Sequence, residues 1–308
     1  MRSKVFVSGS LAYDVLMNFD GTFSDHILAD KISSLSVSFF AKNREIFFGG
    51  CGGNIAYGLS KFDIVPYLFG NGGNDFGRYL SHLNSIGVEC DSVVCDEKLP
   101  TASAFILSDN DANQIAMFSP GAMESNSDIS LSGTVFDFAI LAPLLHERMV
   151  AVGRALQGNS MRYLLDPGQA LVSLTKEQLE FLISGAHSMV LNEYESELFE
   201  KKMGCSLSDF DSHFDFVVVT LGENGSEVRR GGVVTRVAAL SNLEVVDPTG
   251  CGDSFRAGFI AALQNGQDLS TALKWGNVIA SFCLEVKGSQ SYDFSLEDFN
   301  ERLRTTYP

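Results

Sequence analysis

The chain has 308 residues, of which 45% are hydrophobic and 19% charged, a balance typical of a globular protein and unlike that of disordered or fibrous chains. Its net charge of −16 argues against general nucleic-acid binding, because such proteins carry a basic face. The six cysteines form no Cys-x-x-Cys pair, which argues against a zinc site and favours reduced thiols in the cytoplasm. The sequence shows neither an apolar run long enough to span a membrane nor the long apolar core of a signal peptide.

Strand-like and helix-like segments alternate along most of the chain. Strands are predicted at residues 5–7, 64–69, 138–142, 163–166, 189–192 and 216–220, with a longer β-like run at 233–246. Helices are predicted at residues 54–62, 75–86, 177–183, 193–203, 251–264 and 269–284. This alternation predicts one α/β domain, residues 1–308, built on a doubly wound parallel sheet.

Two extended regions, about 12–48 and 90–120, break this alternation. The second contains a predicted hairpin, 101–107 with 114–118, around the turn signal SDNDAN. We expect these regions to form a small separate sheet.

The strongest motif is Asp247-Pro-Thr-Gly-Cys-Gly-Asp253, which follows the β-like run and opens a predicted helix. Its glycines leave the backbone amides of Gly250, Cys251 and Gly252 uncovered at the positive end of the helix dipole, which suits an anion. A carboxylate beside an anion site repels the anion, so Asp253 needs a chemical reason to be there. General-base work on a nearby hydroxyl is such a reason. The alternative is a glycine-rich turn in which Asp253 is an ordinary first-turn carboxylate.

A second glycine-rich stretch, residues 48–54, also precedes a predicted helix. Four glycines in five positions let a ligand or another segment approach the backbone closely. The alternative is a flexible loop with Asn54 as the helix cap.

Earlier in the chain, Asp14 lies in an otherwise apolar strand, where a charge is costly unless it is hydrogen-bonded. Two sugar hydroxyls would satisfy both its oxygens; the alternative is an edge strand that faces water.

Two further segments follow predicted strands, at the end where α/β folds place ligands. In Asn192-Glu-Tyr-Glu195, Glu195 could hold a hydrated Mg²⁺, or the segment could be the solvated first turn of a helix. Thr220-Leu-Gly222-Glu-Asn-Gly225 could wrap the phosphates or sugar of a nucleotide, or could be a plain hairpin turn. The chain has no Gly-Lys dipeptide, and therefore no Walker A loop, so any phosphate is bound in another way.

Taken together and in this order, the motifs resemble those of the PfkB, or ribokinase-like, family of carbohydrate and nucleoside kinases, along essentially the whole chain. Residues 48–58 and 247–260 carry the two glycine-rich signatures. The stretches LAYDVLMNFDGTF, HILADKISSLSVSFFAKNREIFFGGCGGNIAYGL, SPGAM and LLDPGQA are similar to bacterial and archaeal adenosine kinase-like nucleoside kinases. The resemblance implies a ribokinase-like three-layer α/β/α sandwich, with the two extended regions as a small β-sheet lid.

The resemblance also implies ATP-dependent phosphorylation of a primary hydroxyl. It assigns Asp253 as the base and the amides of Gly250, Cys251 and Gly252 as the anion hole. The residues that match the family's Mg²⁺, phosphate and nucleotide positions are Asn192, Glu195, Thr220, Gly222, Gly225 and Asn277. Those that match its substrate positions are Asp14, Gly50 and Asn54, with Gln169 as a weaker candidate.

The chain departs from the family pattern at two places. Cys251 stands where the family most often has Ala; the residue is still small and its amide is unchanged, so we expect activity. The first glycine-rich motif has no Lys or Arg, whereas ribokinases often carry Lys there, which counts against ribose. Many family members also use a monovalent cation, typically potassium, and Asp247 and Thr249 match that position.

The favoured function is a nucleoside kinase that converts adenosine and ATP to AMP and ADP. The alternative is a sugar kinase of the ribokinase or fructokinase type. Phe39, Phe40, Met117 and Phe118 of the lid regions could offer apolar surface to a base, or could serve lid packing alone. A third hypothesis, a catalytically silent sensor or scaffold, would show loss of the base or of the anion-hole glycines, and neither is lost. Both a monomer and a lid-mediated homodimer fit the sequence.

Overall fold

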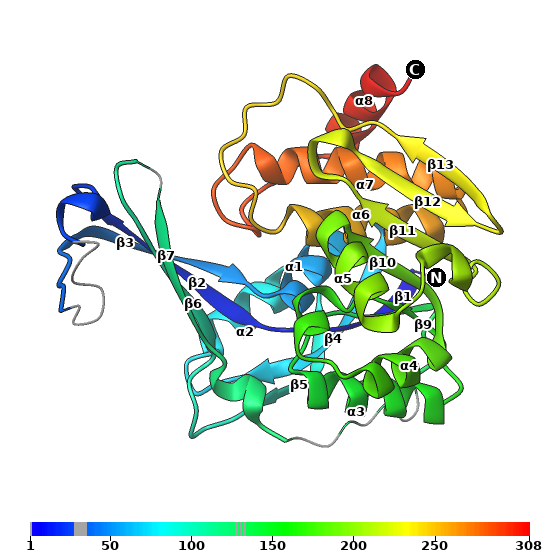
Figure 1. The fold of residues 1–308 in the computed structure, drawn as a ribbon, viewed down its shortest axis with the longest axis horizontal. Helices are drawn as coiled ribbons and strands as arrows, with labels where there is room; N and C mark the ends of the chain where they lie inside the picture. Colours follow the sequence, from blue (N-terminus) through cyan, green and yellow to red (C-terminus); the bar gives the residue numbers. More distant parts are fainter. Residues whose placement is uncertain (1, 28–35, 112, 127–128, 130, 132–133) are drawn as a thin grey trace.

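The computed structural model describes residues 2–27, 36–111, 113–126, 129, 131 and 134–308. Its centre is a nine-stranded sheet in the order β13-β12-β11-β10-β9-β8-β1-β4-β5 (Figure 1). The strands are β1 (Ser3–Ser8), β4 (Ile64–Gly72), β5 (Glu89–Cys95), β8 (Phe138–Leu141), β9 (Tyr163–Leu165), β10 (Ala186–Asn192), β11 (Phe216–Thr220), β12 (Ser226–Arg230) and β13 (Val233–Val237). Neighbouring strands run parallel from β5 to β11, and β12 and β13 are antiparallel.

Helices cover both faces of this sheet. One face carries α1 (Cys51–Ser60), α2 (Gly77–Ser85), α6 (Cys251–Gln264), α7 (Leu269–Leu284) and α8 (Leu296–Thr306). The other face carries α3 (His146–Gly158), α4 (Lys176–Gly185) and α5 (Glu193–Met203). Strand alternation divides the core: on β1, Val5 and Val7 pack into the first layer and Phe6 into the second. The expected three-layer α/β/α architecture is confirmed. No helix in the described part of the chain is long and apolar enough to cross a membrane.

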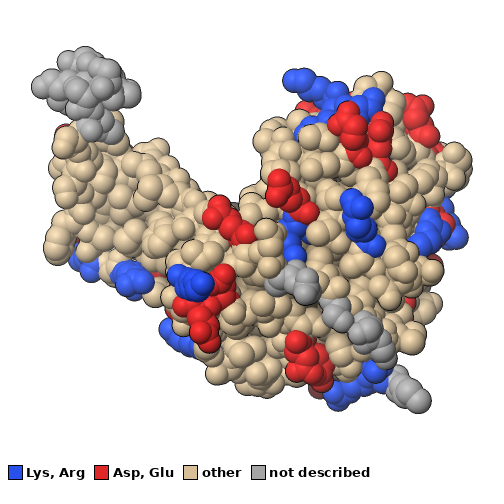
Figure 2. All heavy atoms as spheres, turned by 90° about the horizontal axis from the view of Figure 1, so that it is seen from below, with Lys and Arg blue, Asp and Glu red and all other residues tan. Residues whose placement is uncertain are grey.

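A second, four-stranded sheet forms the lid, in the order β3-β2-β6-β7. Its strands are β2 (Ala12–Phe19), β3 (Ala41–Gly49), β6 (Ala102–Ser108) and β7 (Gln114–Ser119). The predicted hairpin is confirmed, because β6 and β7 pair antiparallel. The lid projects from the body and leaves a hollow between them, and on this face acidic and basic side chains occur side by side (Figure 2).

The structure corrects two expectations. Residues 90–95, expected in the lid, belong to β5 at the edge of the central sheet, because α2 connects β4 to β5 as a crossover between parallel strands. The β-like run 233–246 is a strand only to Val237; beyond it the chain turns away, and Asn242 has a φ of 60°. Residues 28–35 of the expected lid lie outside the described residues.

Two helices, α3 and α8, were not predicted, and α1 begins three residues before its predicted start. The N-terminus of α8 has a local signal, a capping box in which Ser295 and Asp298 bond to each other's backbone amides. The N-cap of α3 is Leu145, which makes no side-chain capping hydrogen bond, so no capping motif in the sequence marks the start of this helix.

Candidate functional site

Two cavities meet at the first turn of α6. The lid cavity, about 380 Å³, lies beneath the lid and is lined by Ser10, Asp14, Gly50, Asn54, Phe118, Met123, Gln169, Gly250 and Asp253, among others. The α7 cavity, about 570 Å³, is lined by Thr220, Gly222, Gly225, Cys251, Gly252, Phe255 and Asn277, among others. The same helical turn therefore presents Gly250 and Asp253 to one cavity and Cys251 and Gly252 to the other.

The turn before α6 is held in a conformation that suits glycine. Gly250, the N-cap, has a φ of 80°, and a Cβ there would lie 2.3 Å from the Ser289 Cβ. The Asp247 carboxylate fixes the turn, accepting hydrogen bonds from the amides of Thr249 (2.9 Å) and Gly288 (3.0 Å). The first-turn amides of a helix have no acceptor within the helix. In α6 the Cys251 amide donates to the Pro248 carbonyl, which lies outside the helix, over 3.3 Å. This end of α6 can bind an anion.

The Asp253 carboxylate is oriented by the buried side chain of Asn54. Asn54 Nδ2 donates to Asp253 Oδ2 over 2.8 Å. Asn54 Oδ1 accepts in turn from Ser289 Oγ and Gln290 Nε2, both over 2.9 Å. Burial raises the pKa of Asp253, and the Arg256 charge and the Asn54 hydrogen bond oppose that rise. The result is a fixed carboxylate with an enhanced affinity for a proton, as a general base needs.

Asp14 lies on β2 at the lid side of the same cavity. Burial, with the nearby negative charges of Asp247 and Asp253, raises its pKa to about 6. Gly49 lies so close that a Cβ there would be 2.3 Å from Asp14 Oδ2. A carboxylate in this environment gains from hydroxyl donors, so Asp14 can bind a polyol next to Asp253.

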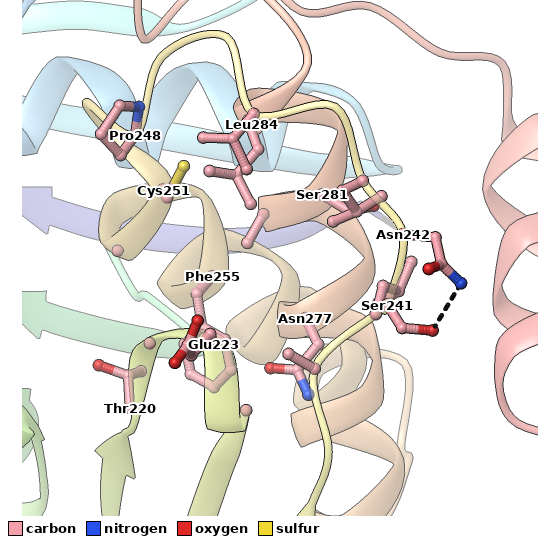
Figure 3. A pocket seen from close by; sticks show the side chains of 18 residues that line it. Thr220, Glu223, Ser241, Asn242, Pro248, Cys251, Phe255, Asn277, Ser281 and Leu284 are labelled. Carbon is pink, nitrogen blue, oxygen red and sulfur yellow. Dashed lines mark hydrogen bonds between the residues drawn. The ribbon is translucent and has the colours of Figure 1, made fainter.

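The α7 cavity combines a polar rim with apolar walls (Figure 3). Thr220 at the end of β11 and Glu223 in the β11–β12 turn line one side of it, and Phe255 of α6 and Leu284 of α7 line others. The buried amide of Asn277 is already engaged: Oδ1 accepts from Ser226 Oγ over 3.1 Å, and Nδ2 lies 3.2 Å from both the Ala238 carbonyl and the Tyr307 hydroxyl. Asn277 thus shapes the cavity by holding the segment after β13.

Asn192 and Glu195 form a capping box at the start of α5. Asn192 Oδ1 accepts from the Glu195 amide over 2.7 Å, and the Asn192 amide donates to Glu195 Oε2 over 2.8 Å. Glu195 Oε2 also lies 4.0 Å from Arg256 Nη2. Neither residue lines the two cavities, but Asn192 is the register partner of Thr220, which lines the α7 cavity.

Within the described ranges, no three His, Cys, Asp or Glu side chains gather to hold a metal. Mg²⁺ commonly takes only one or two protein carboxylates and completes its shell with water and substrate phosphates. The single carboxylate of Glu195 therefore fits a partial, water-mediated contribution to a magnesium site.

Of the four lid side chains proposed to offer apolar surface to a base, one lines the lid cavity and three do not. Phe118 lines the lid cavity. Phe39 packs against Phe19 and Phe23 inside the lid, and Met117 pairs with Phe105 on the face opposite to Phe118. Phe40 is 85% exposed.

Sequence reasoning missed the segment 285–291 and the side chains of Ser10 and Arg256. Ser10 Oγ accepts a hydrogen bond from the Cys51 amide, and so seats the first turn of α1. Ser289 and Gln290 reach Asn54 across the fold and carry no local motif. Arg256 could have been noticed as a charge on an otherwise apolar face of α6, the helix that begins at Cys251.

A family model, that of the pfkB family carbohydrate kinases, matches residues 16–294. The nucleoside kinase of Methanocaldococcus jannaschii is 27% identical over 302 residues, covering 97% of this chain and 96% of that protein. The nucleoside kinase of Methanothermobacter thermautotrophicus is 31% identical over 279 residues, covering 87% and 88%.

Solved structures agree with these sequence matches. The M. jannaschii nucleoside kinase superposes with a TM-score of 0.89 over 99% of both chains, at 26% identity. The Burkholderia thailandensis nucleoside kinase in complex with inosine gives a TM-score of 0.84 at 29% identity, covering 99% of this chain and 98% of that one. The same enzyme in complex with ADP-inosine gives 0.82 at 30% identity, covering 99% and 96%.

Proposed function

The chain belongs to the PfkB family of carbohydrate kinases and is a phosphotransferase, and we propose that it is an ATP-dependent nucleoside kinase. In this proposal the γ-phosphoryl group of ATP passes to the 5′-hydroxyl of a nucleoside, with adenosine as the expected acceptor and AMP and ADP as products. The observation that carries the proposal is the shared first turn of α6, which separates a lid-covered cavity containing a carboxylate from a second cavity of nucleotide size.

The lid cavity takes the nucleoside. Asp14, Gly50 and Asn54 bind the ribose, and Gln169 lies where it can meet the substrate. Phe118, Met123 and Leu144 give the cavity an apolar wall that a base can use and a free sugar would leave exposed. This wall supports a nucleoside over ribose or fructose, the sugar-kinase alternative.

The α7 cavity takes ATP. Thr220, Gly222 and Gly225 surround the phosphates or sugar, while Asn277 shapes the far wall. The nucleotide's phosphates then point toward the amides of Gly250, Cys251 and Gly252 from the side opposite to the nucleoside. Magnesium, when bound, would neutralise phosphate charge, with Asn192 and Glu195 as the residues that organise it. Asp247 and Thr249 are the candidate residues for a monovalent cation such as potassium.

Asp253 acts at the meeting point of the two cavities. Its carboxylate takes the proton from the acceptor hydroxyl as the oxygen forms its bond to the γ-phosphorus and the bond to the ADP oxygen breaks. The anion-hole amides stabilise the charge on the transferring group. The lid over the cavity excludes water, which would otherwise compete as acceptor. The six free cysteines fit the cytoplasmic location proposed for the enzyme.

The test is ADP release with Mg·ATP against adenosine, inosine, guanosine, cytidine, ribose and fructose. Turnover with nucleosides and none with free sugars is the expected result, and the relative kcat/KM values rank adenosine against the others. Turnover with a free sugar alone would contradict the nucleoside assignment and leave the family, the base and the anion hole in place.

A further inference from the structure

Arg256 is a buried cation one helical turn after Asp253, and its side chain is only 7% exposed. A guanidinium this deep is costly unless its charge and its hydrogen-bond donors are matched. The groups around it include three carboxylates, those of Asp166, Glu195 and Asp253, which come from three different elements. Burial disfavours the charged form, but the carboxylates of Asp166, Asp253 and Glu195 together more than offset this, so the pKa of Arg256 is raised.

The contacts of Arg256 connect the parts of the site. Its Nη2 donates to Asp166 Oδ1 over 2.8 Å, and its Nε pairs with Asp166 Oδ2. Its Nη1 donates to the Gly252 carbonyl over 2.9 Å, and its Nη2 lies 4.0 Å from Glu195 Oε2. One planar group thus spans the end of β9, the first turn of α6 and the first turn of α5.

The partner residues leave space for this arrangement. A Cβ on Gly252 would lie 3.0 Å from Arg256 Nη1, so the anion-hole glycine is also the residue that admits the guanidinium. Asp166 is 1% exposed and directly precedes the segment that carries Gln169. The ion pair therefore joins the anion hole on one side to the wall of the lid cavity on the other.

We propose that Arg256, anchored by Asp166, is a positioning residue for phosphoryl transfer, which fixes the anion hole and Asp253 relative to β9 and Glu195. The inference rests on the proposed kinase reaction. It goes beyond that reaction by assigning the step that fails when Arg256 is lost: alignment of bound substrates rather than their binding. Arg256 acts through the Gly252 carbonyl and the Asp166 and Glu195 carboxylates, and it lines neither cavity.

The experiment compares Arg256→Met, Arg256→Lys and Asp166→Asn with a control, Arg229→Met. Arg229 is a half-buried arginine on β12 whose Nη2 lies 3.3 Å from Asp211 Oδ2, and it lines neither cavity. We measure kcat and KM with the acceptor that the wild type prefers, acceptor Kd by calorimetry, and thermal unfolding. Because misplacing reacting groups by about 1 Å costs on the order of 100-fold, Arg256→Met is expected to lower kcat by about that factor while Kd stays within about threefold.

A second experiment tests whether added methylguanidinium restores the activity of a variant that lacks the Arg256 side chain. In Arg256→Ala it is expected to restore part of kcat, whereas methylammonium, which lacks the planar fork, restores less. Asp166→Asn and Arg256→Lys keep much of the site's shape, and intermediate losses of kcat at unchanged Kd are expected from both. They keep the test decisive if Arg256→Met and Arg256→Ala do not fold.

The proposal is overturned if the folded Arg256→Lys and Asp166→Asn variants keep kcat within about threefold of the wild type, as expected for a solely structural ion pair. It is also overturned if the loss of kcat is matched by an equal loss of acceptor affinity. Failure of the proposed function is a separate result, because wild type that uses only a free sugar still allows the same comparison with that sugar as acceptor.

Discussion

The Asp253 carboxylate is held by Asn54 at the junction of the two cavities. The substitution Asp253→Asn keeps the shape and the contact with Asn54 but removes the proton acceptor. We expect kcat to fall by about 10³-fold while the nucleoside Kd changes by less than about threefold, because general-base loss affects the transition state only. Single-turnover kinetics with calorimetry measure both quantities. Phosphate transfer near the wild-type rate would show that another group is the base.

Nucleoside binding is expected to depend on pH through Asp14. Burial and the charges of Asp247 and Asp253 raise the pKa of this residue to about 6. Its ionised form accepts hydrogen bonds from ribose hydroxyls, and this form is lost as the pH falls through 6. The nucleoside Kd is therefore expected to be about tenfold weaker at pH 5 than at pH 7. Asp14→Asn should bind weakly at both values and lose the dependence. An equal pH dependence in that variant would assign it to another group.

The grouping of several site residues was predictable from local motifs, while their catalytic and binding roles stay predictions. The motifs single out Asp253, Gly250, Asn54 and Asp14, and the structure brings all four to one cavity. Ser289, by contrast, reaches Asn54 from 235 positions away in the chain, and no local pattern encodes that contact. The local motif at residues 192–195 encodes the capping box that the structure shows, and its role toward phosphate and metal stays a prediction.

The N-terminus of α6 requires a backbone conformation at Gly250 that favours glycine. Gly250→Ala forces a Cβ to within 2.3 Å of the Ser289 Cβ at a φ of 80°, so we expect a loss of about 1–3 kcal/mol in the free energy of unfolding, together with a fall in kcat. Gly266→Ala is the control: its φ is 72°, and a Cβ there would meet nothing within 4 Å. It should cost about 1 kcal/mol and leave kcat unchanged. Equal effects on kcat would contradict a special role for the α6 turn.

The lid is tied to the body by an ion pair between Glu45 of β3 and Lys287 of the segment after α7. Both side chains are about two-fifths exposed, at 41% and 38%, so the pair contributes at most about 1 kcal/mol. That energy is enough to raise the nucleoside KM by about threefold in Lys287→Met, with little change in thermal stability.

The control for the lid contact is Lys42→Met, which removes a pair with Asp20 in which both side chains are about two-thirds exposed. It should leave KM unchanged. In the double variant Glu45→Gln/Lys287→Met, KM should rise no further than in either single variant. Additive effects would show that the two residues act separately.

Element type followed from periodicity, but sheet membership did not. Residues 90–95 look extended in either sheet, and only the crossover through α2 places them beside β4. The run 233–246 pairs only as far as Val237, which lies opposite Ser226, the first residue of β12, so the start of its partner strand sets its length.

On the scale of the whole molecule, the fold places two cavities back to back on one helix N-terminus and covers one of them with a second sheet. The strand–helix alternation predicted the parallel sheet and a small separate sheet, and the family resemblance implied the three layers and the lid. They were not sufficient to predict the ion pair of Arg256 or the lid contact at Lys287, since both join segments far apart in the sequence. A lid-mediated homodimer stays a prediction alongside the monomer.

The most direct test of the central claim is ³¹P NMR of the product formed from Mg·ATP and adenosine, with 5′-deoxyadenosine as the matched acceptor. The account predicts a nucleoside 5′-monophosphate with adenosine, ADP in equal amount, and no phosphorylated product with 5′-deoxyadenosine. A phosphate on the 2′- or 3′-hydroxyl, or a phosphorylated 5′-deoxyadenosine, would contradict the placement of the 5′-hydroxyl at Asp253.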